Sequence, residues 1–490
     1  MSLRICFAAS EIAPLAKTGG LADVAAALPR FLHAQGHDVR LFMPMYSSMG
    51  LAGLGATHVP GVQDVQLELG THRYAFSLLQ AHLPSSPLPV LLVHCPAVFD
   101  RSAIYTEAAD EHLRFLVLQH AVLQSCQRLG FAPQILHCND WHTALLPLLL
   151  KTVYSWDRLF ESTRSVLTIH NIGYQGMFGV DTLRDIAAQG TSMPADQVDL
   201  SGQQFNWLRE GIRHAHQVTT VSPTYAHEIR SPTGGHGLDA VLRDRHDDTI
   251  GILNGVDYDE WNPATDRYLK HPYDAENLSG KIANKRVLLD WFNLPPATEQ
   301  PLLGVVSRLT SQKGFDLLFD SVPELLTGRE VYLVALGSGE RRYEEFFTNL
   351  QRRFPSQVVF HRGYHEELAH LIEAASDIFL MPSLYEPCGL NQMYSLKYGT
   401  VPVVRHTGGL ADSVQMWDAA TSQGTGIVFN DFDTAAMRWA LHIALDLFKD
   451  RNAWRQLMRN GMAQDFSWQQ QGQQYLELYT ALASAPAPTD

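Results

Sequence analysis

The amino-acid sequence predicts an α/β protein made of two doubly wound parallel-sheet domains in series. Continuous Val, Ile and Leu runs alternate with amphipathic helical stretches along the chain. This alternation breaks once, in the turn-rich stretch 231–263, and then starts again. The six residues TGGLAD occur twice, at 18–23 and 407–412, each time between an expected strand and an expected helix. A length of 490 residues accommodates two large or three small domains, and the single break favours two.

The first half of the chain supplies the strands of the first sheet. Each is a short apolar run without polar alternation, which is typical of parallel strands buried on both faces. Helices are expected over 20–36, near 107–129 and from Trp141. The expected strands are 3–10, 38–44, 90–96, 134–140, 165–171 and 217–223.

The second half repeats this pattern after the break. We place the domain boundary within it, which gives a first domain over 1–248 and a second over 249–466. The chain is helical from about residue 433, and a last helix over about 467–490 is expected to pack back on the first domain. The expected strands are 301–309, 331–339, 358–364, 377–383, 401–406 and 425–430.

Composition narrows the class of protein. The net charge of -14 argues against nonspecific binding to nucleic acid or to an anionic membrane. The five cysteines include no CxxC pair, which favours buried thiols in a reducing compartment. No apolar run approaches the roughly 20 residues of a membrane span, and the N-terminus has no signal-peptide pattern. We therefore expect a cytoplasmic protein.

Two cations stand at the end of one expected strand. Arg308 is where the strand 301–309 ends, and Lys313 follows in the loop before a helix. At the carboxyl end of a parallel strand the two can converge on one diphosphate, Arg as a planar fork and Lys as a point charge. The alternative is a pair of solvated surface charges.

A carboxylate and a glycine turn follow the strand 377–383. Glu386 precedes the turn Pro387–Gly389, which exposes N–H groups at the start of a helix. A carboxylate beside a phosphate site is unfavourable unless it binds hydroxyls, which a sugar supplies. Helix capping is the alternative role for Glu386. The paired glycines of TGGLAD likewise suit close approach of an anionic ligand, or simply a tight strand-to-helix turn. A cleft between the loops 17–20 and 386–389 therefore suits a sugar nucleotide.

Eight longer motifs resemble bacterial glycogen synthase and plant starch synthase. They are KTGGLADV (17–24), HCNDWHTALLP (137–147), TIHNIGYQGMF (168–178), TVSPTYAHEI (220–229), GILNGVD (251–257), VSRLTSQKG (306–314), RGYHEEL (362–368) and EPCGL with KYGTVPVVRHTGGLAD (386–412). The resemblance implies the GT-B fold, in which two Rossmann-like domains face a central cleft. It also implies transfer of glucose from ADP-glucose to the non-reducing end of an α-1,4-glucan, with retention of configuration.

The resemblance assigns roles to individual residues. Those it places in catalysis are His170, Glu386, Arg308, Lys313 and Asp140. Arg308 and Lys313 match the diphosphate pair, and the main chain and side chain of His170 face the donor sugar. Tyr364 matches the aromatic residue that stacks on adenine, and Asp23 a carboxylate that supports the loop 17–20. The remaining substrate-binding matches are Lys17, Gly19, Gly20, Asn171, Asn254, Cys388, Gly389, Leu390, Asn391, Thr407, Gly408 and Gly409.

Among the departures from the family pattern, the change of Leu-Ala to Ile172–Gly173 has no expected chemical consequence, but two others affect contacts. Asn391 stands where Thr or Ser is expected, which removes a side-chain hydroxyl contact. Tyr394 stands where related retaining families carry a second Glu, so a ribose contact must come from elsewhere. The stretch 183–204 matches least and is a candidate for a variable loop on the acceptor side.

The resemblance also shapes the expected chemistry. Lys17, Arg308 and Lys313 would stabilise departing ADP, and the His170 carbonyl the charge at glucose C1. No carboxylate stands out as a nucleophile, so same-face attack is favoured, with the leaving phosphate taking the acceptor proton. Fixed cations replace a metal, so no metal or other cofactor is expected. The site is expected to be complete only when the two domains close.

Three other functions stay open at this stage. The first is a related transferase that uses UDP-glucose or a small acceptor, and the second is a non-catalytic glucan-binding protein. The third, a nicotinamide dehydrogenase, lacks the GxGxxG motif after the first strand. Oligomeric state is left open, with a homo-oligomer among the alternatives.

Overall fold

The computed structural model describes residues 2–49, 51–83, 86–187, 197–199 and 204–485. Its contacts divide the chain into two compact units. The first comprises residues up to Val221, Ala226–Gly255 and the C-terminal residues from Trp468; the second comprises Ser222–Tyr225 and Val256–Ser467. Most of the candidate loop 183–204 lies outside the described residues.

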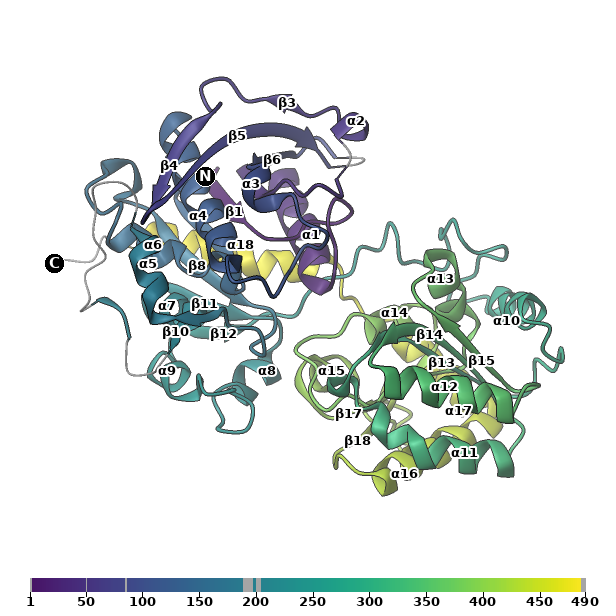
Figure 1. Ribbon diagram of the computed structural model, residues 1–490. Helices are drawn as coiled ribbons and strands as arrows, with labels where there is room; N and C mark the ends of the chain where they lie inside the picture. The colour runs from purple at the N-terminus through teal and green to yellow at the C-terminus, as the bar shows by residue number, and fades with distance from the viewer. Residues whose placement is uncertain (1, 50, 84–85, 188–196, 200–203, 486–490) are drawn as a thin grey trace. The chain divides into compact units, whose positions relative to one another are not determined.

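The first unit is built on a ten-stranded sheet among the described residues (Figure 1). Its parallel part runs in the order β12 (Thr249–Gly251), β11 (Gln217–Thr220), β8 (Arg164–Ile169), β7 (Ile135–Asn139), β1 (Arg4–Ala8), β2 (Asp38–Pro44) and β6 (Pro89–His94). Every residue of β7 and β8 is buried, as expected for central parallel strands. Strand β12 pairs in parallel with β11, so residues 249–255 lie with the first unit.

One edge of this sheet differs from the all-parallel expectation. Strand β5 (His72–His82) runs antiparallel to β6 and carries β3 (Thr57–His58) and β4 (Val65–Leu69), both also antiparallel to it. Buried residues alternate with exposed or half-buried ones in β4, and half-buried residues alternate with exposed ones in the first part of β5, because there one face of each strand is open to solvent. The predicted parallel core is therefore extended by an antiparallel segment that the apolar runs do not reveal.

Helices cover the first sheet. The C-terminal helix α18 (Trp468–Ser484) packs against α1 (Gly20–Ala34) and β7, and in Figure 1 this yellow helix lies among the purple and blue elements. Its Tyr479 hydroxyl hydrogen-bonds the buried Nδ1 of His137, 2.5 Å away. The other elements are α2 (Leu51–Leu54), α3 (Pro96–Phe99), α4 (Glu111–Arg128), η1 (Trp141–Thr143), α5 (Leu146–Lys151), η2 (Arg158–Phe160), β9 (Met177–Gly179), η3 (Val180–Thr182), α6 (Leu183–Ile186), β10 (Gln204–Asn206), α7 (Trp207–His214) and α9 (Asp239–Asp244), while α8 (Pro223–Glu228) spans the division between the units.

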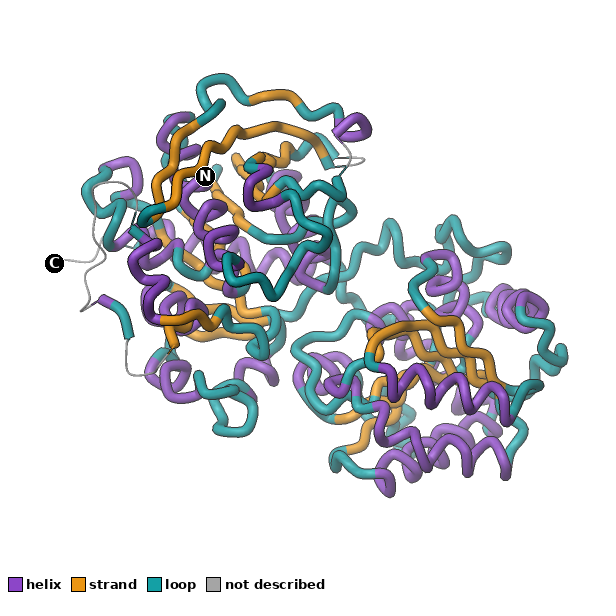
Figure 2. Tube along the Cα trace, viewed as in Figure 1, coloured by secondary structure: helices purple, strands orange, loops and turns teal. Residues whose placement is uncertain are grey.

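The second unit is a parallel sheet with helices on either side of it (Figure 2). Its six strands are, in spatial order, β15 (Val358–Arg362), β14 (Tyr332–Gly339), β13 (Leu302–Leu309), β16 (Ile378–Met381), β17 (Val401–Arg405) and β18 (Ile427–Phe429). The helical elements are α10 (Ser279–Trp291), η5 (Ser311–Lys313), η6 (Phe315–Leu317), α11 (Leu318–Gly328), α12 (Arg341–Arg353), α13 (Glu366–Ala375), α14 (Asn391–Lys397), α15 (Gly408–Ser413), α16 (Thr434–Lys449) and α17 (Arg451–Met462).

The helices of the second unit follow from their apolar spacing. In α12 the buried residues include Tyr343, Phe347 and Leu350, which are spaced four and three apart and so share one helix face. These side chains join Leu333 and Val358 of the sheet in one hydrophobic core. This core fixes the strands whose carboxyl ends carry the predicted site residues. Among the described residues, no helix is long and apolar enough to cross a membrane.

Candidate functional site

The first group of predicted residues lies in the loop between β1 and α1. Lys17 Nζ is 2.7 Å from Oδ1 of Asp23, in the first turn of α1. This ion pair matches the predicted support of the loop by Asp23. Gly19 and Gly20 have open space where a side chain would be, with nothing within 4 Å of a built Cβ atom. The loop can therefore admit a ligand against its backbone.

Glu11 holds this loop, and the sequence interpretation did not single it out. Its carboxylate accepts hydrogen bonds from the Thr18 N–H, from the Thr18 hydroxyl at 2.6 Å and from the Tyr105 hydroxyl. Glu11 is buried although it is charged. An acid shortly after the carboxyl end of the central parallel strand β1 is the signal that could have identified it. The partner Tyr105 is 94 residues away and gave no signal.

The second group lies at the carboxyl ends of β7 and β8. The backbone N–H groups of His170 and Asn171 donate to Asp140 Oδ1 at 2.7 and 3.4 Å. His170 Nε2 lies 2.9 Å from Oδ1 of Asn139, whose Nδ2 donates to the carbonyl of Ala8. Because that amide is oriented by Ala8, Nε2 of His170 carries the proton and donates. The structure thus brings Asp140, His170 and Asn171 together.

Burial sets the charge of this group. Desolvation raises the pKa of Asp140 to about 7, although the N–H groups of His170 and Asn171 oppose the change. Desolvation also lowers the pKa of His170 to about 3, so its imidazole is neutral at physiological pH. Asp140 has φ = 53°, a left-handed conformation that few non-glycine residues adopt. Such strain is typical of functional positions.

Asn254 follows β12, at the same edge of the sheet. It is buried, and its Oδ1 has no hydrogen-bond partner among the described residues. A buried acceptor without a partner is costly unless a ligand or water supplies a donor. The role of Asn254 as a sugar-contacting amide stays a prediction, in which a sugar hydroxyl would supply this donor.

In the second unit, Lys313 and Glu386 lie together. Lys313 Nζ, at the end of η5, donates to Oε2 of Glu386 over 2.6 Å, and both side chains are largely buried. Ser383 Oγ donates to the same oxygen at 3.0 Å. The predicted diphosphate lysine is therefore also the counter-ion of the predicted sugar-binding carboxylate. Neither segment alone shows this pairing, because 73 residues separate the two.

The turn 407–409 packs directly on the backbone of the loop 386–389. The N–H of Gly409 donates to the carbonyl of Glu386 at 3.0 Å. A Cβ atom on Gly408, where φ is 44°, would lie 2.0 Å from that carbonyl oxygen, and one on Gly409 would lie 2.1 Å from the oxygen of Cys388. Cys388 itself is buried. These two glycines are required by the packing of the two predicted phosphate-side loops against each other.

Arg308 and Tyr364 lie at the carboxyl ends of β13 and β15. Both are exposed, and Tyr364 reaches an exposed fraction of 67%. The Tyr364 hydroxyl donates to Glu366, while the Arg308 guanidinium forms no ion pair within the part of the chain that the structure describes. The structure places these two residues at the predicted edge without joining them to the Lys313–Glu386 pair.

Asn391 and Tyr394, which depart from the family pattern, have structural roles. Asn391, next to Leu390 at the start of α14, donates from Nδ2 to the carbonyl of Val306 in β13 at 2.8 Å. The Tyr394 ring stacks on Trp261 with centroids 3.9 Å apart and the planes nearly parallel. Asn391 therefore ties α14 to the sheet, and Tyr394 belongs to an aromatic cluster.

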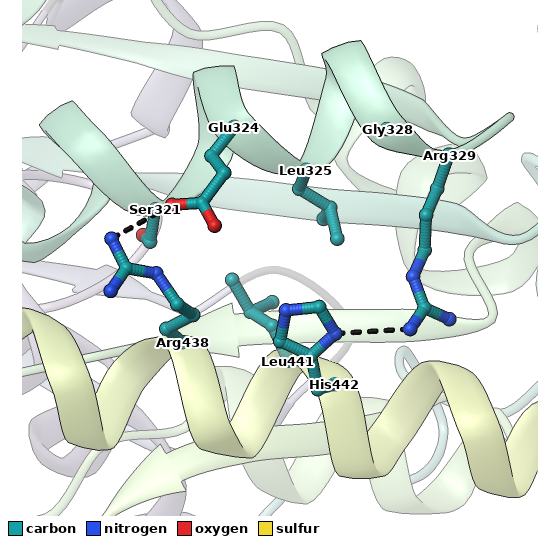
Figure 3. Close-up of a pocket in the computed structure, with 8 residues that line it drawn as sticks. All are labelled: Ser321, Glu324, Leu325, Gly328, Arg329, Arg438, Leu441 and His442. Atoms are coloured by element: carbon teal, nitrogen blue, oxygen red, sulfur yellow. Dashed lines mark hydrogen bonds and ion pairs between the residues drawn. The ribbon is translucent and has the colours of Figure 1, made fainter.

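One surface groove among the described residues lies away from the predicted site residues. It has a volume of about 200 Å³ and is formed by α11 and α16 (Figure 3). Its two arginines are paired, Arg438 with Glu324 at 2.8 Å and Arg329 with His442 at 3.0 Å. No predicted site residue lines it. The predicted site residues lie instead in the loops at the carboxyl ends of the strands.

Patterns of known families match both halves of the chain. Residues 4–244 match the starch synthase catalytic domain, and residues 290–460 match the group 1 glycosyl transferases. The fold is also similar to sucrose-phosphate synthase from Thermosynechococcus elongatus, with a TM-score of 0.63, 17% identity and coverage of 99% of this chain and 100% of that one. The fold and these matches define a glycosyltransferase of the GT-B class.

Relatives with higher sequence identity show which family of glycosyltransferases the chain belongs to. Glycogen synthase of Koribacter versatilis is 42% identical, with 99% of each chain covered. Glycogen synthase 2 of Geobacter sulfurreducens is 41% identical over 98% of this chain and 99% of its own. The catalytic domain of Arabidopsis thaliana starch synthase IV, solved with ADP and acarbose, has a TM-score of 0.90 at 35% identity, covering 99% of this chain and 100% of that domain. The chain belongs to the glycogen synthase and starch synthase family, and it is a hexosyltransferase.

Proposed function

We propose that this enzyme transfers glucose from ADP-glucose to the non-reducing end of an α-1,4-glucan, with retention of configuration and release of ADP. The observation that carries the proposal is the full-length likeness to the starch synthase IV domain, whose structure holds ADP and acarbose. ADP is what remains of ADP-glucose after the transfer. Glycogen or a maltooligosaccharide is the proposed acceptor.

The second unit is proposed to bind the nucleotide sugar. Lys313 has three N–H donors, so it can hold Glu386 and a phosphate oxygen at once. The exposed Arg308 would supply the planar fork for the diphosphate. Tyr364, with its exposed ring, would stack on adenine. The loop 388–391 and the turn 407–409 would present backbone N–H groups to the phosphates, while Glu386 would accept from glucose hydroxyls.

The first unit is proposed to hold the sugar and the acceptor. His170 is neutral and its ring is oriented by Asn139, so its main-chain carbonyl can stabilise developing positive charge at C1 without a competing imidazolium. Lys17 would help to stabilise departing ADP. Asp140, with a pKa of about 7, is proposed as the active-site acid. Gly19 and Gly20 leave room for the ligand beside this group.

Catalysis is proposed to depend mainly on electrostatic stabilisation of the transition state. The acceptor hydroxyl would attack glucose C1 from the same face that the phosphate leaves. The departing phosphate would take the proton of the acceptor hydroxyl, so that no protein carboxylate needs to act as nucleophile. Isolation of a covalent glucosyl–enzyme adduct would contradict this route. Because fixed cations stabilise the leaving group, we propose that transfer needs no metal or other cofactor. Transfer rates that survive extensive treatment with EDTA are the expected result.

One assay tests the proposal against its closest rival. Labelled glucose is supplied as ADP-glucose or as UDP-glucose, with maltooligosaccharides as acceptor, and the product linkage is analysed. Faster transfer from ADP-glucose into α-1,4 linkages is expected. Faster transfer from UDP-glucose would overturn the donor, and absence of transfer from both would point to a non-catalytic glucan-binding protein.

We propose a cytoplasmic enzyme without nucleic-acid or membrane partners, as the family membership and the net charge of -14 suggest. Cell fractionation with an antibody to the chain checks the location. Sedimentation of the purified protein determines whether it forms a homo-oligomer.

A further inference from the structure

Among the described residues, three side chains outside the catalytic loops have the spacing of metal ligands. They are Glu260, Glu366 and His370, and one ligand atom from each lies within 4.8 Å of the others. Glu366 and His370 are four residues apart on α13, so they share one face of that helix. Glu260 comes from the loop 252–278 that precedes α10.

The His370 ring is fixed in one orientation. Its side chain is fully buried, and its Nδ1 lies 2.8 Å from Oδ2 of Asp266. Trp261 stacks on the ring with a centroid distance of 3.8 Å and an angle of 12°, and Tyr268 packs at 4.7 Å. The ring therefore cannot turn to find another partner for its second nitrogen.

That second nitrogen, Nε2, has no hydrogen-bond partner among the described residues. It points toward the carboxylates, with Oε1 of Glu366 at 3.5 Å. A buried histidine that donates from Nδ1 to a carboxylate and leaves Nε2 for a ligand has the arrangement that supports metal binding in proteins. Asp266 is itself held, because the Tyr398 hydroxyl donates to the same Oδ2 at 2.6 Å.

We propose that Glu260, Glu366 and His370 bind one divalent transition-metal ion, with Zn²⁺ as the representative ion. Bonds of about 2.0–2.2 Å place two ligands no more than roughly 4.4 Å apart, so the carboxylates must move by roughly half an ångström. They can do so because Glu260 is exposed and the Glu366 side chain is 39% exposed. One imidazole nitrogen and two carboxylates suit Zn²⁺ or Mn²⁺ better than Mg²⁺, which prefers oxygen ligands and its own waters.

The bound ion would tie the loop 252–278 to α13, so it is expected to stabilise the second unit.

The test is calorimetric titration of Zn²⁺ into the full chain after removal of metals with a chelator. The wild-type chain is expected to bind one tight equivalent of Zn²⁺. Its melting temperature should rise with Zn²⁺ but not with the same concentration of Mg²⁺. Glu260→Gln is the main variant because Glu260 is exposed and Gln keeps the size of the side chain.

Glu260→Gln and Glu366→Gln are each expected to weaken the tight site by about tenfold or more. Glu367→Gln, one residue along the same helix, is the matched control and should bind as the wild type does. The proposal is overturned if the wild-type chain shows no tight equivalent. It is also overturned if the Glu260 and Glu366 variants bind as the control does, because the three residues would then form only an ion-pair network.

Discussion

The ammonium group of Lys313 lies 2.6 Å from Oε2 of Glu386, with both side chains largely shielded from water. Lys313 is at the end of η5, and Glu386 is in the loop after β16. The pair joins the proposed phosphate-binding cation to the proposed sugar-binding carboxylate. In the proposed complex with the nucleotide sugar, Lys313 would donate hydrogen bonds to a phosphate oxygen and to Glu386 at the same time. A change in either residue should therefore affect both stability and transfer.

Lys313→Ala is expected to slow transfer on the order of 10²–10³-fold, because departing ADP loses a fixed cation. It should also destabilise the fold by on the order of 3 kcal/mol, because Glu386 is left buried without its counter-ion. The double variant Lys313→Met/Glu386→Gln should regain stability but not transfer. Initial rates and thermal unfolding measure the two effects.

The control for this variant is Lys449→Ala. Lys449 pairs with Asp446 at 2.9 Å, but both side chains are exposed. Its loss should change stability by less than about 1 kcal/mol and leave transfer unchanged. Wild-type transfer by a folded Lys313→Ala enzyme would contradict the role of Lys313.

Glu386→Gln should reduce transfer more than it reduces ADP binding. ADP lacks the glucose hydroxyls that Glu386 is proposed to bind, and Gln can still accept from Lys313 and Ser383. Steady-state rates are compared with the ADP dissociation constant from calorimetry. Equal losses in both quantities would place Glu386 with the phosphates instead of the sugar.

Gly408→Ala and Gly19→Ala change the same position in the two TGGLAD copies and should behave differently. Gly408 has φ = 44° and a carbonyl oxygen 2.0 Å from the built Cβ, so its variant should lose on the order of 3 kcal/mol. Gly19 has an extended φ of -160° and open space, so its variant should stay within about 0.5 kcal/mol of the wild type.

The rate of glucose transfer should also distinguish the Gly19→Ala variant from the Gly408→Ala variant. Gly19→Ala should slow transfer in a stable protein, because the new methyl group fills the space proposed for the ligand. Thermal unfolding and initial rates are measured side by side for both variants. Equal melting temperatures would show that the two copies do not differ in packing as described.

Asp140→Asn should stabilise the fold at and above neutral pH while it reduces transfer. The folded chain keeps the Asp140 proton up to about pH 7, whereas an ordinary Asp loses it near 3.8. The folded state therefore binds more protons between these values, and wild-type stability declines as pH rises from about 4 to 7. Each tenfold change in the acid constant is worth about 1.4 kcal/mol, so the gain is a few kcal/mol at most.

The Asn side chain suits this position in other respects. It tolerates the positive φ and can still accept from the N–H groups of His170 and Asn171. Unfolding of both proteins in urea is measured across this pH range. A stability difference that does not change with pH would show that Asp140 does not titrate as described.

Tyr364→Ala should raise the KM for ADP-glucose by on the order of tenfold with a smaller change in kcat, because base stacking on an aromatic ring is worth about 1–3 kcal/mol. Tyr364→Phe keeps the ring and should remain close to the wild type. Trp439→Ala, which removes another exposed aromatic side chain of the second unit, is the control. An unchanged KM in Tyr364→Ala would remove Tyr364 from the adenine site.

Much of the fold was predictable from local patterns. The buried strands β7, β8, β13 and β17 are recognisable because each is a short apolar run between helical stretches. The predicted α/β class with doubly wound sheets is confirmed. The antiparallel strands β3, β4 and β5 were not predicted. Exposed polar residues interrupt β4 and the first part of β5, so the sequence there lacks the continuous apolar run of a strand that is buried on both faces. The cleft between the domains stays a prediction.

The sequence by itself determined which residues stand at the carboxyl ends of strands and which family the chain resembles. Both depend on residue order over short stretches, and Arg308, Asp140 and Glu386 are readable in that way. Only the tertiary structure decided that Lys313 pairs with Glu386, that Glu11 holds Thr18, and that two identical TGGLAD segments meet different surroundings. These are contacts between segments distant in sequence, or between a segment and its neighbours in space. Packing brings such segments together, and no local pattern in either one specifies its partner.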